Sequence, residues 1–134
     1  MKALSIRQPW AWFILADGPE PLPKPYENRD WSDAYARAQM ALCPPGSEFL
    51  IHASAGMTKQ EFKEAVEFAM SIGVTRVPQF EEVKRGGIVG MARHEGLVRS
   101  ARSRWFAGRL ALKLVAPYPL PFRECKGALG FFEV

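Results

Sequence analysis

Apolar residues near the start of the chain form two compact runs that a short polar turn separates. Ala3–Ile6 predicts a short buried strand. Pro9 suits the first turn of a helix, and the apolar run Trp10–Leu15 predicts a short helix that Gly18 can end. Four prolines within residues 18–25 exclude a helix or a central strand, so this stretch predicts a stiff loop.

Two helices and one strand are predicted in the middle of the chain. The alanine-rich stretch 34–42 predicts a weak helix of a turn or two, and Phe49–Ala53 predicts a strand. Thr58 followed by Glu61 forms a capping box, so a helix is expected over 58–72. Apolar residues recur in it at helical spacing, which predicts that the helix covers one side of a sheet through Phe62, Val66 and Ala69.

The last third of the chain reads as strands and turns. Ile88–Ala92 predicts a strand, and the alternation of leucines with other residues over 110–115 predicts a half-buried one. Three prolines within 117–121 predict the end of that strand, and the apolar stretch 129–134 predicts a final one.

These elements number five or six strands and two or three helices, and no linker or internal repeat divides the 134 residues. We therefore expect a single domain over residues 1–134. Because strands and helices do not alternate regularly, the pattern favours an α+β fold built on a small, strongly curved sheet or β-barrel.

Composition narrows the class of protein. With 48% hydrophobic and 12% aromatic residues the chain can fill a core, which excludes global disorder. No apolar run is long enough for a transmembrane helix and the N-terminus has no signal-peptide pattern, so we expect a cytoplasmic protein with no membrane contact. The two cysteines, Cys43 and Cys125, form no CxxC motif, so neither a metal site nor a cofactor is expected.

The positive charge gathers late in the chain. The net charge is +4, and five arginines lie between residues 93 and 109, where Glu95 is the only acid. Arg102 and Arg104 at the centre of this stretch are candidates for contact with a phosphate backbone. A solvated loop rich in arginine is the alternative.

The densest polar cluster follows the proline-rich loop. In an extended segment Glu27, Arg29 and Trp31 share one face, and Lys24 precedes them. A guanidinium can bind a phosphate or a base edge, and an indole can stack on a base. The alternative is a surface ion pair between Glu27 and Arg29 beside a core tryptophan.

A second cluster lies where the first predicted strand turns into its helix. Gln8 offers a donor and an acceptor there, and Trp10 is either a ligand contact or part of the core. His52 is expected to be a satisfied strand residue, and His94 to be solvated. No spacing identifies a hydrolase nucleophile, although distance in sequence cannot exclude one.

Three segments taken in order, residues 4–11, 24–31 and 50–54, resemble the ASCH (activating signal cointegrator homology) domain, a branch of the PUA-like superfamily. The family signature is roughly Gly-x-Lys-x-x-Glu-x-Arg, and its residues match Gly18, Lys24, Glu27 and Arg29. This sequence departs from the signature by an insertion, Pro19 to Pro23. Later segments are also similar to the family, so the resemblance spans the whole chain: 87–90, 103–108 and 126–132.

The resemblance implies a β-barrel of five or six strands flanked by helices, with a cleft at one side in which relatives bind RNA or modified bases. One bacterial branch is similar to amidohydrolases that remove an acetyl group from a modified cytidine, and it places Thr where this sequence has Glu27. Lys24 is kept, but a carboxylate cannot replace the threonine hydroxyl as a nucleophile, so that chemistry is not expected in the same form.

Three functions remain open. The first is binding of single-stranded or modified RNA or nucleotide in a cleft. The second is a hydrolase, acting on RNA or a modified nucleoside, in which Lys24 and Glu27 form an acid–base pair. The third is a protein-interaction module. The residues expected to bind the ligand are Gln8, Trp10, Lys24, Glu27, Arg29, Trp31, Ser54, Arg102 and Arg104.

Overall fold

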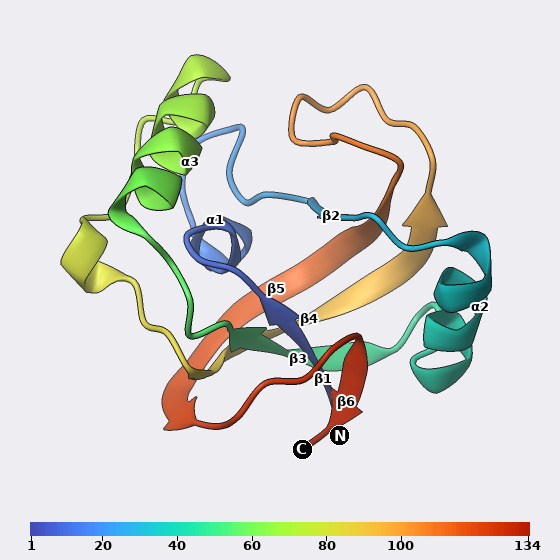
Figure 1. Ribbon diagram of the computed structural model, residues 1–134. Coiled ribbons are helices and arrows are strands. Elements are labelled where there is room, and N and C mark those ends of the chain that lie inside the picture. Colours follow the sequence, from blue (N-terminus) through green and yellow to red (C-terminus); the bar gives the residue numbers. More distant parts are fainter.

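A six-stranded, strongly curled sheet forms the body of the computed structural model, which describes residues 1–134, and three helices accompany it (Figure 1). The strands are β1 (Lys2–Ile6), β2 (Tyr26–Arg29), β3 (Glu48–Ala53), β4 (Gly87–Val98), β5 (Leu110–Glu124) and β6 (Phe131–Glu133). The helices are α1 (Trp10–Leu15), α2 (Asp33–Leu42) and α3 (Lys59–Ser71), and a short 3-10 turn covers Phe80–Glu82. This arrangement confirms the predicted α+β fold on a small curved sheet.

The strand order is β2-β5-β4-β3-β1-β6. Only β1 and β3 run parallel, and the other neighbours are antiparallel. Since β2 and β6 do not pair with each other, the sheet curls without closing and leaves an opening between its two edges. The two termini lie side by side near that opening, where the backbone amide of Val134 donates to the carbonyl of Met1 at 3.0 Å.

Two apolar clusters fill the interior. The larger one lies inside the curl, where α1 rests against β3 and β5, and it includes Leu4, Ile14, Phe49, Ile51, Leu110 and Leu112. Position 90 in β4 favours glycine, because a Cβ there would lie 2.8 Å from the backbone carbonyl oxygen of Tyr118 in β5 as well as 2.5 Å from the Leu15 side chain of α1. The smaller cluster lies on the outer side of α1 and contains Phe13, Ala16, Leu22, Ala69, Val74 and Trp105.

The capping box and helix predicted from Thr58 are confirmed. Thr58 Oγ1 accepts from the amide of Glu61 at 3.0 Å, and the Glu61 carboxylate accepts from the amide of Thr58 at 2.9 Å. The predicted packing face is partly wrong. Ala65 and Ala69 are the buried residues of α3, whereas the Phe62 ring packs edge-on against Phe80. α3 therefore covers the smaller cluster beside α1 instead of lying on the sheet.

The prolines over 117–121 do not end β5, contrary to expectation. β5 pairs with β4 as far as Glu124, while β2 pairs with it only over Leu110–Lys113. Beyond Lys113, one edge of β5 is open. The three prolines are two residues apart, so their missing amides fall on the same side, and an open edge needs no donor there.

His94 is also not solvated, as had been expected. It is fully buried, its Nε2 lies 2.9 Å from the carbonyl of Cys43, and its Nδ1 accepts from the amide of Gly96. Burial lowers the pKa of the imidazole below its ordinary value. No helix in the structure has the length and apolar character to cross a bilayer.

Candidate functional site

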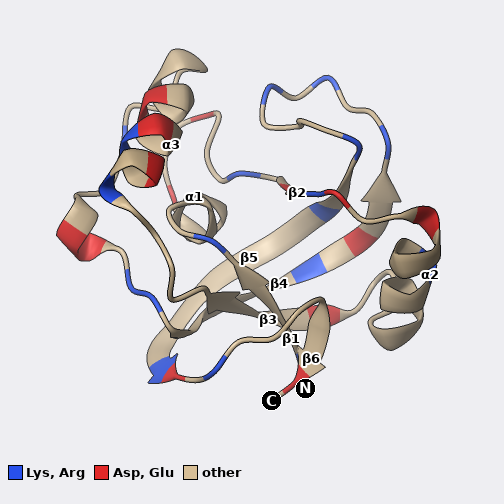
Figure 2. Ribbon diagram, viewed as in Figure 1, with Lys and Arg blue, Asp and Glu red and all other residues tan.

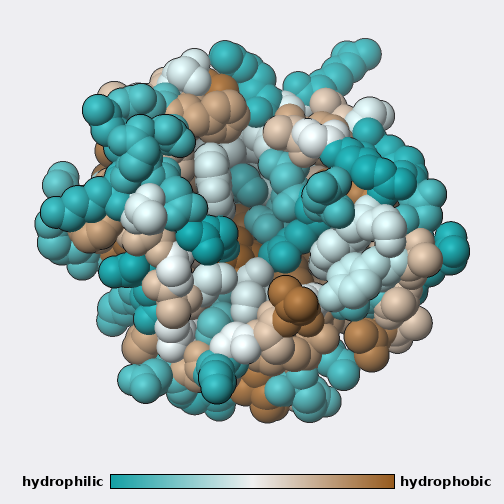
Figure 3. Space-filling view, in the orientation of Figure 1, coloured by the Kyte–Doolittle hydropathy of each residue, from teal (hydrophilic) through white to brown (hydrophobic).

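A cavity of about 540 Å³ opens between α3 on one side and β2 with the β4–β5 loop on the other. Figure 3 shows the surface hollowed between these two sides. Aromatic rings and carboxylates dominate its lining, and we call it the aromatic cavity. It is lined by Trp10, Lys24, Glu27, Asn28, Glu61, Glu64, Ala65, Phe68, Trp105 and Ala107.

A buried charge network forms the floor on the β2 side. The Nζ of Lys24 donates to the carbonyl of Tyr26 and lies 3.5 Å from Oε1 of Glu27. The second carboxylate oxygen, Oε2, lies 3.0 Å from Nη2 of Arg29. Lys24 and Glu27 are 3% and 7% exposed, so the network is nearly free of solvent screening.

Backbone bonds fix the position of Lys24 at the end of the proline-rich loop. Its amide donates to the carbonyl of Phe13 in α1 at 2.9 Å, and the carbonyl of Pro25 accepts from the amide of Leu114 in β5 at 2.8 Å. The loop is thereby tied to a helix and a strand on either side of the lysine. Burial lowers the pKa of the Lys24 amine below its ordinary value, although the charge of Glu27 opposes this effect.

Three aromatic rings form a chain of edge contacts beside this network. Phe68 of α3 meets Trp10 and Trp105 at centroid distances of 6.1 Å each. The Lys24 amine also lies over the Trp10 ring, with Nζ 5.6 Å from the ring centroid. Trp105 is buried, Trp10 is half-buried and Phe68 is exposed, so Trp10 and Phe68 are the rings within reach of a ligand.

The loop between β4 and β5 is held against β2 by one amide side chain. Asn28 Nδ2 donates to the carbonyl of Trp105 at 2.9 Å, and Asn28 Oδ1 accepts from the amide of Ala107 at 3.0 Å. The indole of Trp105 in turn donates to the carbonyl of Pro21 at 2.7 Å. Asn28 therefore positions the loop that forms one wall of the cavity.

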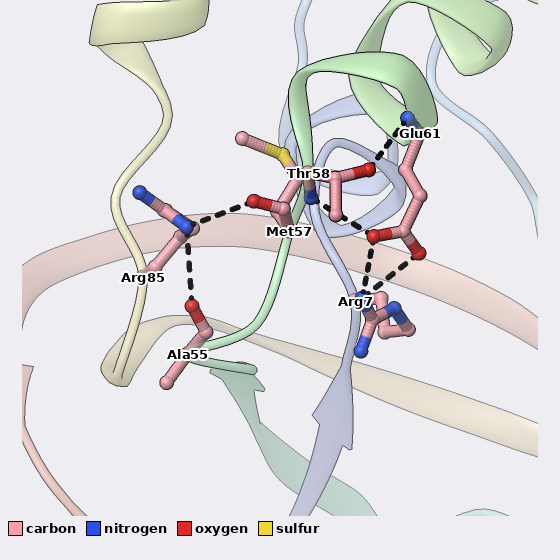
Figure 4. A network of polar contacts seen from close by, with 6 residues as sticks. All are labelled: Arg7, Ala55, Met57, Thr58, Glu61 and Arg85. Carbon is pink, nitrogen blue, oxygen red and sulfur yellow. Dashed lines mark hydrogen bonds and ion pairs between the residues drawn. The ribbon is translucent and has the colours of Figure 1, made fainter.

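The opposite wall is the first half of α3, and an arginine from the end of β1 fixes it. Nη2 of Arg7 lies 2.9 Å from both carboxylate oxygens of Glu61, which also caps the helix (Figure 4). The bond from the Thr58 amide is the main cause that lowers the pKa of the Glu61 carboxyl. Arg85, which lies just before β4, donates to the carbonyls of Ala55 and Met57 in the loop that precedes α3 (Figure 4).

The predicted sharing of one face by Glu27, Arg29 and Trp31 is consistent with the contacts. The Arg29 guanidinium lies beside Glu27 and 5.7 Å from the ring centroid of Trp31. Arg29 and Trp31, however, contact the protein interior and not the cavity. Arg29 donates to the carbonyl of Ser5 at 2.6 Å, leaving its Nε buried without an acceptor. Trp31 belongs to the larger core cluster, so only Glu27 of the three lines the cavity.

Two other predicted ligand residues lie elsewhere. Gln8 is buried, and both polar atoms of its side chain have partners, since Oε1 accepts from the amide of Trp12 and Nε2 donates to the carbonyl of Lys84. It caps α1 where Pro9 offers no side-chain acceptor. Ser54 lines a different cavity, at the end of β3.

Most arginines of the late basic stretch are paired within the chain. Arg99 and Arg109 both bind Asp33 at the start of α2, at 2.8 and 2.7 Å, and hydrogen bonds from Arg99 and then Arg109 lower the pKa of that carboxyl. Arg102 and Arg104 are exposed and make no ion pair or side-chain hydrogen bond. They lie on the β4–β5 loop that walls the aromatic cavity, and Figure 2 shows the basic positions along that loop.

Sequence reasoning missed Asn28, Phe68 and Trp105 as parts of this site. The alternation that joins Glu27 to Arg29 gives no reason to include the residue between them. Phe68 carries no signal beyond that of an apolar residue in an amphipathic helix. No cluster of three or more His, Cys, Asp or Glu side chains is placed to bind a metal ion. No protein-family model matches the chain, and no curated protein matches it.

Proposed function

We propose that the aromatic cavity binds a base of single-stranded or modified RNA, or of a free nucleotide, as expected of an ASCH domain. The observation that carries the proposal is the combination of accessible rings, Trp10 and Phe68, with the buried carboxylate of Glu27 in one cavity. Rings supply a stacking surface for an unpaired base, worth about 1–3 kcal/mol per base. A carboxylate supplies an acceptor for an exocyclic amine.

The charges around the cavity favour a base inside it and phosphate outside it. Three carboxylates line the interior, those of Glu27, Glu61 and Glu64, against the single amine of Lys24, so the interior as a whole would repel a phosphate. Arg102 and Arg104 are free on the adjoining loop, where they can contact the backbone of a bound strand. A nucleotide whose base carries an amino group fits this distribution of charge. Its amino group can donate to the carboxylates inside the cavity while its phosphate stays at the rim.

Phe68→Ala tests the stacking surface directly. Phe68 is 38% exposed, so its loss should weaken binding of a short single-stranded RNA by about 1–3 kcal/mol while leaving the fold intact. Met70→Ala is the matched control, because Met70 is exposed on the same helix and does not line the cavity. Equal losses in the two variants, or no RNA binding by the unmodified protein, would contradict the proposal.

A hydrolase acting on RNA or a modified nucleoside is the second candidate. The observation that favours it is the buried Lys24 amine 3.5 Å from the Glu27 carboxylate, where burial lowers the pKa of the amine. A buried amine with a lowered pKa next to a carboxylate can exchange a proton with a bound substrate. Turnover of RNA and of N-acylated nucleosides, measured for the unmodified protein and for Lys24→Met, separates the two candidates. Binding without turnover would exclude the hydrolase and support only the binding function.

A further inference from the structure

A serine and a histidine on adjacent strands form a hydrogen-bonded pair away from the aromatic cavity. Ser5 of β1 lies opposite His52 of β3 in the parallel register. The Ser5 Oγ is 2.9 Å from Nδ1 of His52, and Nε2 of His52 is 2.6 Å from the carbonyl of Cys125. The histidine is buried, while the serine is half-buried.

The carbonyl of Cys125 sets the tautomer of the ring. A carbonyl only accepts, so Nε2 must carry the proton and donate it, which leaves Nδ1 of a neutral His52 as an acceptor. The Ser5 hydroxyl then donates to Nδ1. This is the protonation pattern of a serine nucleophile next to its general base, with a backbone carbonyl orienting the base.

The pair opens onto a second cavity of about 690 Å³, which we call the serine cavity. Ser5, His52, Cys125, Lys126 and Gly127 are among its lining residues. The backbone at Gly127 touches the pair, because a Cβ at that position would lie 2.6 Å from Ser5 Oγ and 2.7 Å from the His52 ring. Only glycine leaves room for the hydroxyl and the ring there.

The loop that approaches the hydroxyl at Gly127 carries backbone amides without an acceptor. The backbone amides of Gly127 and its neighbours Lys126 and Ala128 donate to no backbone or side-chain acceptor in the chain. Donors of this kind can stabilise the negative oxygen that develops when a hydroxyl adds to a carbonyl. The exposed amine of Lys126 forms no ion pair and adds a positive charge at the rim.

We propose that Ser5 and His52 form a nucleophilic pair that cleaves small carboxylic esters in the serine cavity. Ser5 Oγ bonds to the acyl carbon while its proton moves to Nδ1 of His52. The bond to the leaving alcohol oxygen then breaks, and that oxygen takes the proton from Nδ1. Water, activated by the same nitrogen, hydrolyses the acyl-serine and regenerates the hydroxyl. The proposal does not depend on nucleotide binding in the aromatic cavity.

A fluorophosphonate probe tests the nucleophile in the unmodified protein. Ser5 Oγ bonds to phosphorus, fluoride leaves, and the hydroxyl proton passes to His52. Peptide mass spectrometry should find the adduct on Ser5, and p-nitrophenyl acetate should give a burst of p-nitrophenol followed by slower turnover. No adduct on Ser5, under conditions that label a known serine esterase, would overturn the proposal.

Two variants test the role of each residue. Ser5→Ala should abolish labelling, whereas Ser100→Ala, which removes an exposed serine without a histidine partner, should leave it unchanged. His52→Gln can keep a donor to the Cys125 carbonyl but has no base, so the labelling rate should fall about 100-fold or more. Labelling of folded His52→Gln at the original rate would show that His52 only holds the strands together, and would overturn the pair as a catalytic unit.

Discussion

Nζ of Lys24 lies 3.5 Å from Oε1 of Glu27, and both side chains are almost completely withdrawn from solvent. Removing two charges from water costs free energy that their attraction recovers only with good geometry and further hydrogen bonds. The carbonyl of Tyr26 supplies such a bond to Lys24, and Arg29 shares the carboxylate. These contacts offset part of the free energy that burying the pair at the floor of the aromatic cavity costs.

Removing the carboxylate should be the more damaging single change in this network. Glu27→Gln leaves Lys24 and Arg29 without their shared counter-charge, and the free energy of unfolding should fall by about 3–5 kcal/mol. Lys24→Met should cost less, because Glu27 keeps Arg29 and an apolar side chain replaces the buried amine. Urea denaturation of both variants measures the difference. A larger loss for Lys24→Met would contradict this account of the network.

The lowered pKa of Lys24 predicts a pH dependence of stability. Between the native pKa and the value of 10.5 in the unfolded chain, the unfolded protein binds more protons, so raising the pH favours the native state. Below the native pKa both states are protonated and this gain is absent. The unfolding free energy of the native protein minus that of Lys24→Met should therefore rise with pH in the alkaline range below 10.5. A difference that falls with pH would contradict the assignment.

The contribution of the α3 capping box to stability can be measured without changing the residues at the floor of the aromatic cavity. Thr58→Ala removes the acceptor for the amide of Glu61 and should lower the free energy of unfolding by about 1 kcal/mol. Thr75→Ala, at an exposed threonine outside the helix, serves as the control and should change stability by less than half as much. Thermal unfolding of both variants gives the comparison. Equal shifts would mean that the capping box contributes nothing.

The free arginines should add a salt-dependent term to RNA binding. Replacing Arg102 and Arg104 by Ala should weaken binding at low salt and make the affinity less sensitive to salt, by a slope change of about 1–2. Arg37→Ala with Arg123→Ala is the matched control, since both arginines are exposed and unpaired but lie outside the β4–β5 loop. Filter binding at several salt concentrations measures the slopes. Identical slopes for the two double variants would show that the loop arginines are only solvated.

Local patterns predicted most elements, because their signals lie within a few residues. The capping box at Thr58 and the apolar run at Trp10–Leu15 specify their helices without tertiary contacts. The continuation of β5 through its prolines could not be predicted in this way. It depends on β2 being short, which leaves the proline edge of β5 unpaired.

The candidate site was predicted in part for the same reason. Lys24, Glu27 and Trp10 line one cavity, as the hypothesis drawn from the resemblance expected, whereas the spacing alone did not connect Trp10 with the other two. Phe68 and Trp105 join them only because α3 and the β4–β5 loop fold back on either side of α1. Trp31 lies in the core, which was the alternative that the sequence left open. Gln8 caps α1, a role that its spacing does not reveal.

A direct comparison of single-stranded and duplex RNA tests the central claim most sharply. A cavity walled by Trp10 and Phe68 can stack an unpaired base but cannot reach one inside a duplex without flipping it out. Fluorescence anisotropy with one short sequence, as a single strand and as a blunt duplex at the same moderate salt, measures both affinities. We predict that the single strand binds more tightly than the duplex, and that Phe68→Ala removes this preference by weakening single-strand binding. Tighter binding of the duplex, or single-strand binding that Phe68→Ala leaves unchanged, would contradict a base-binding cavity.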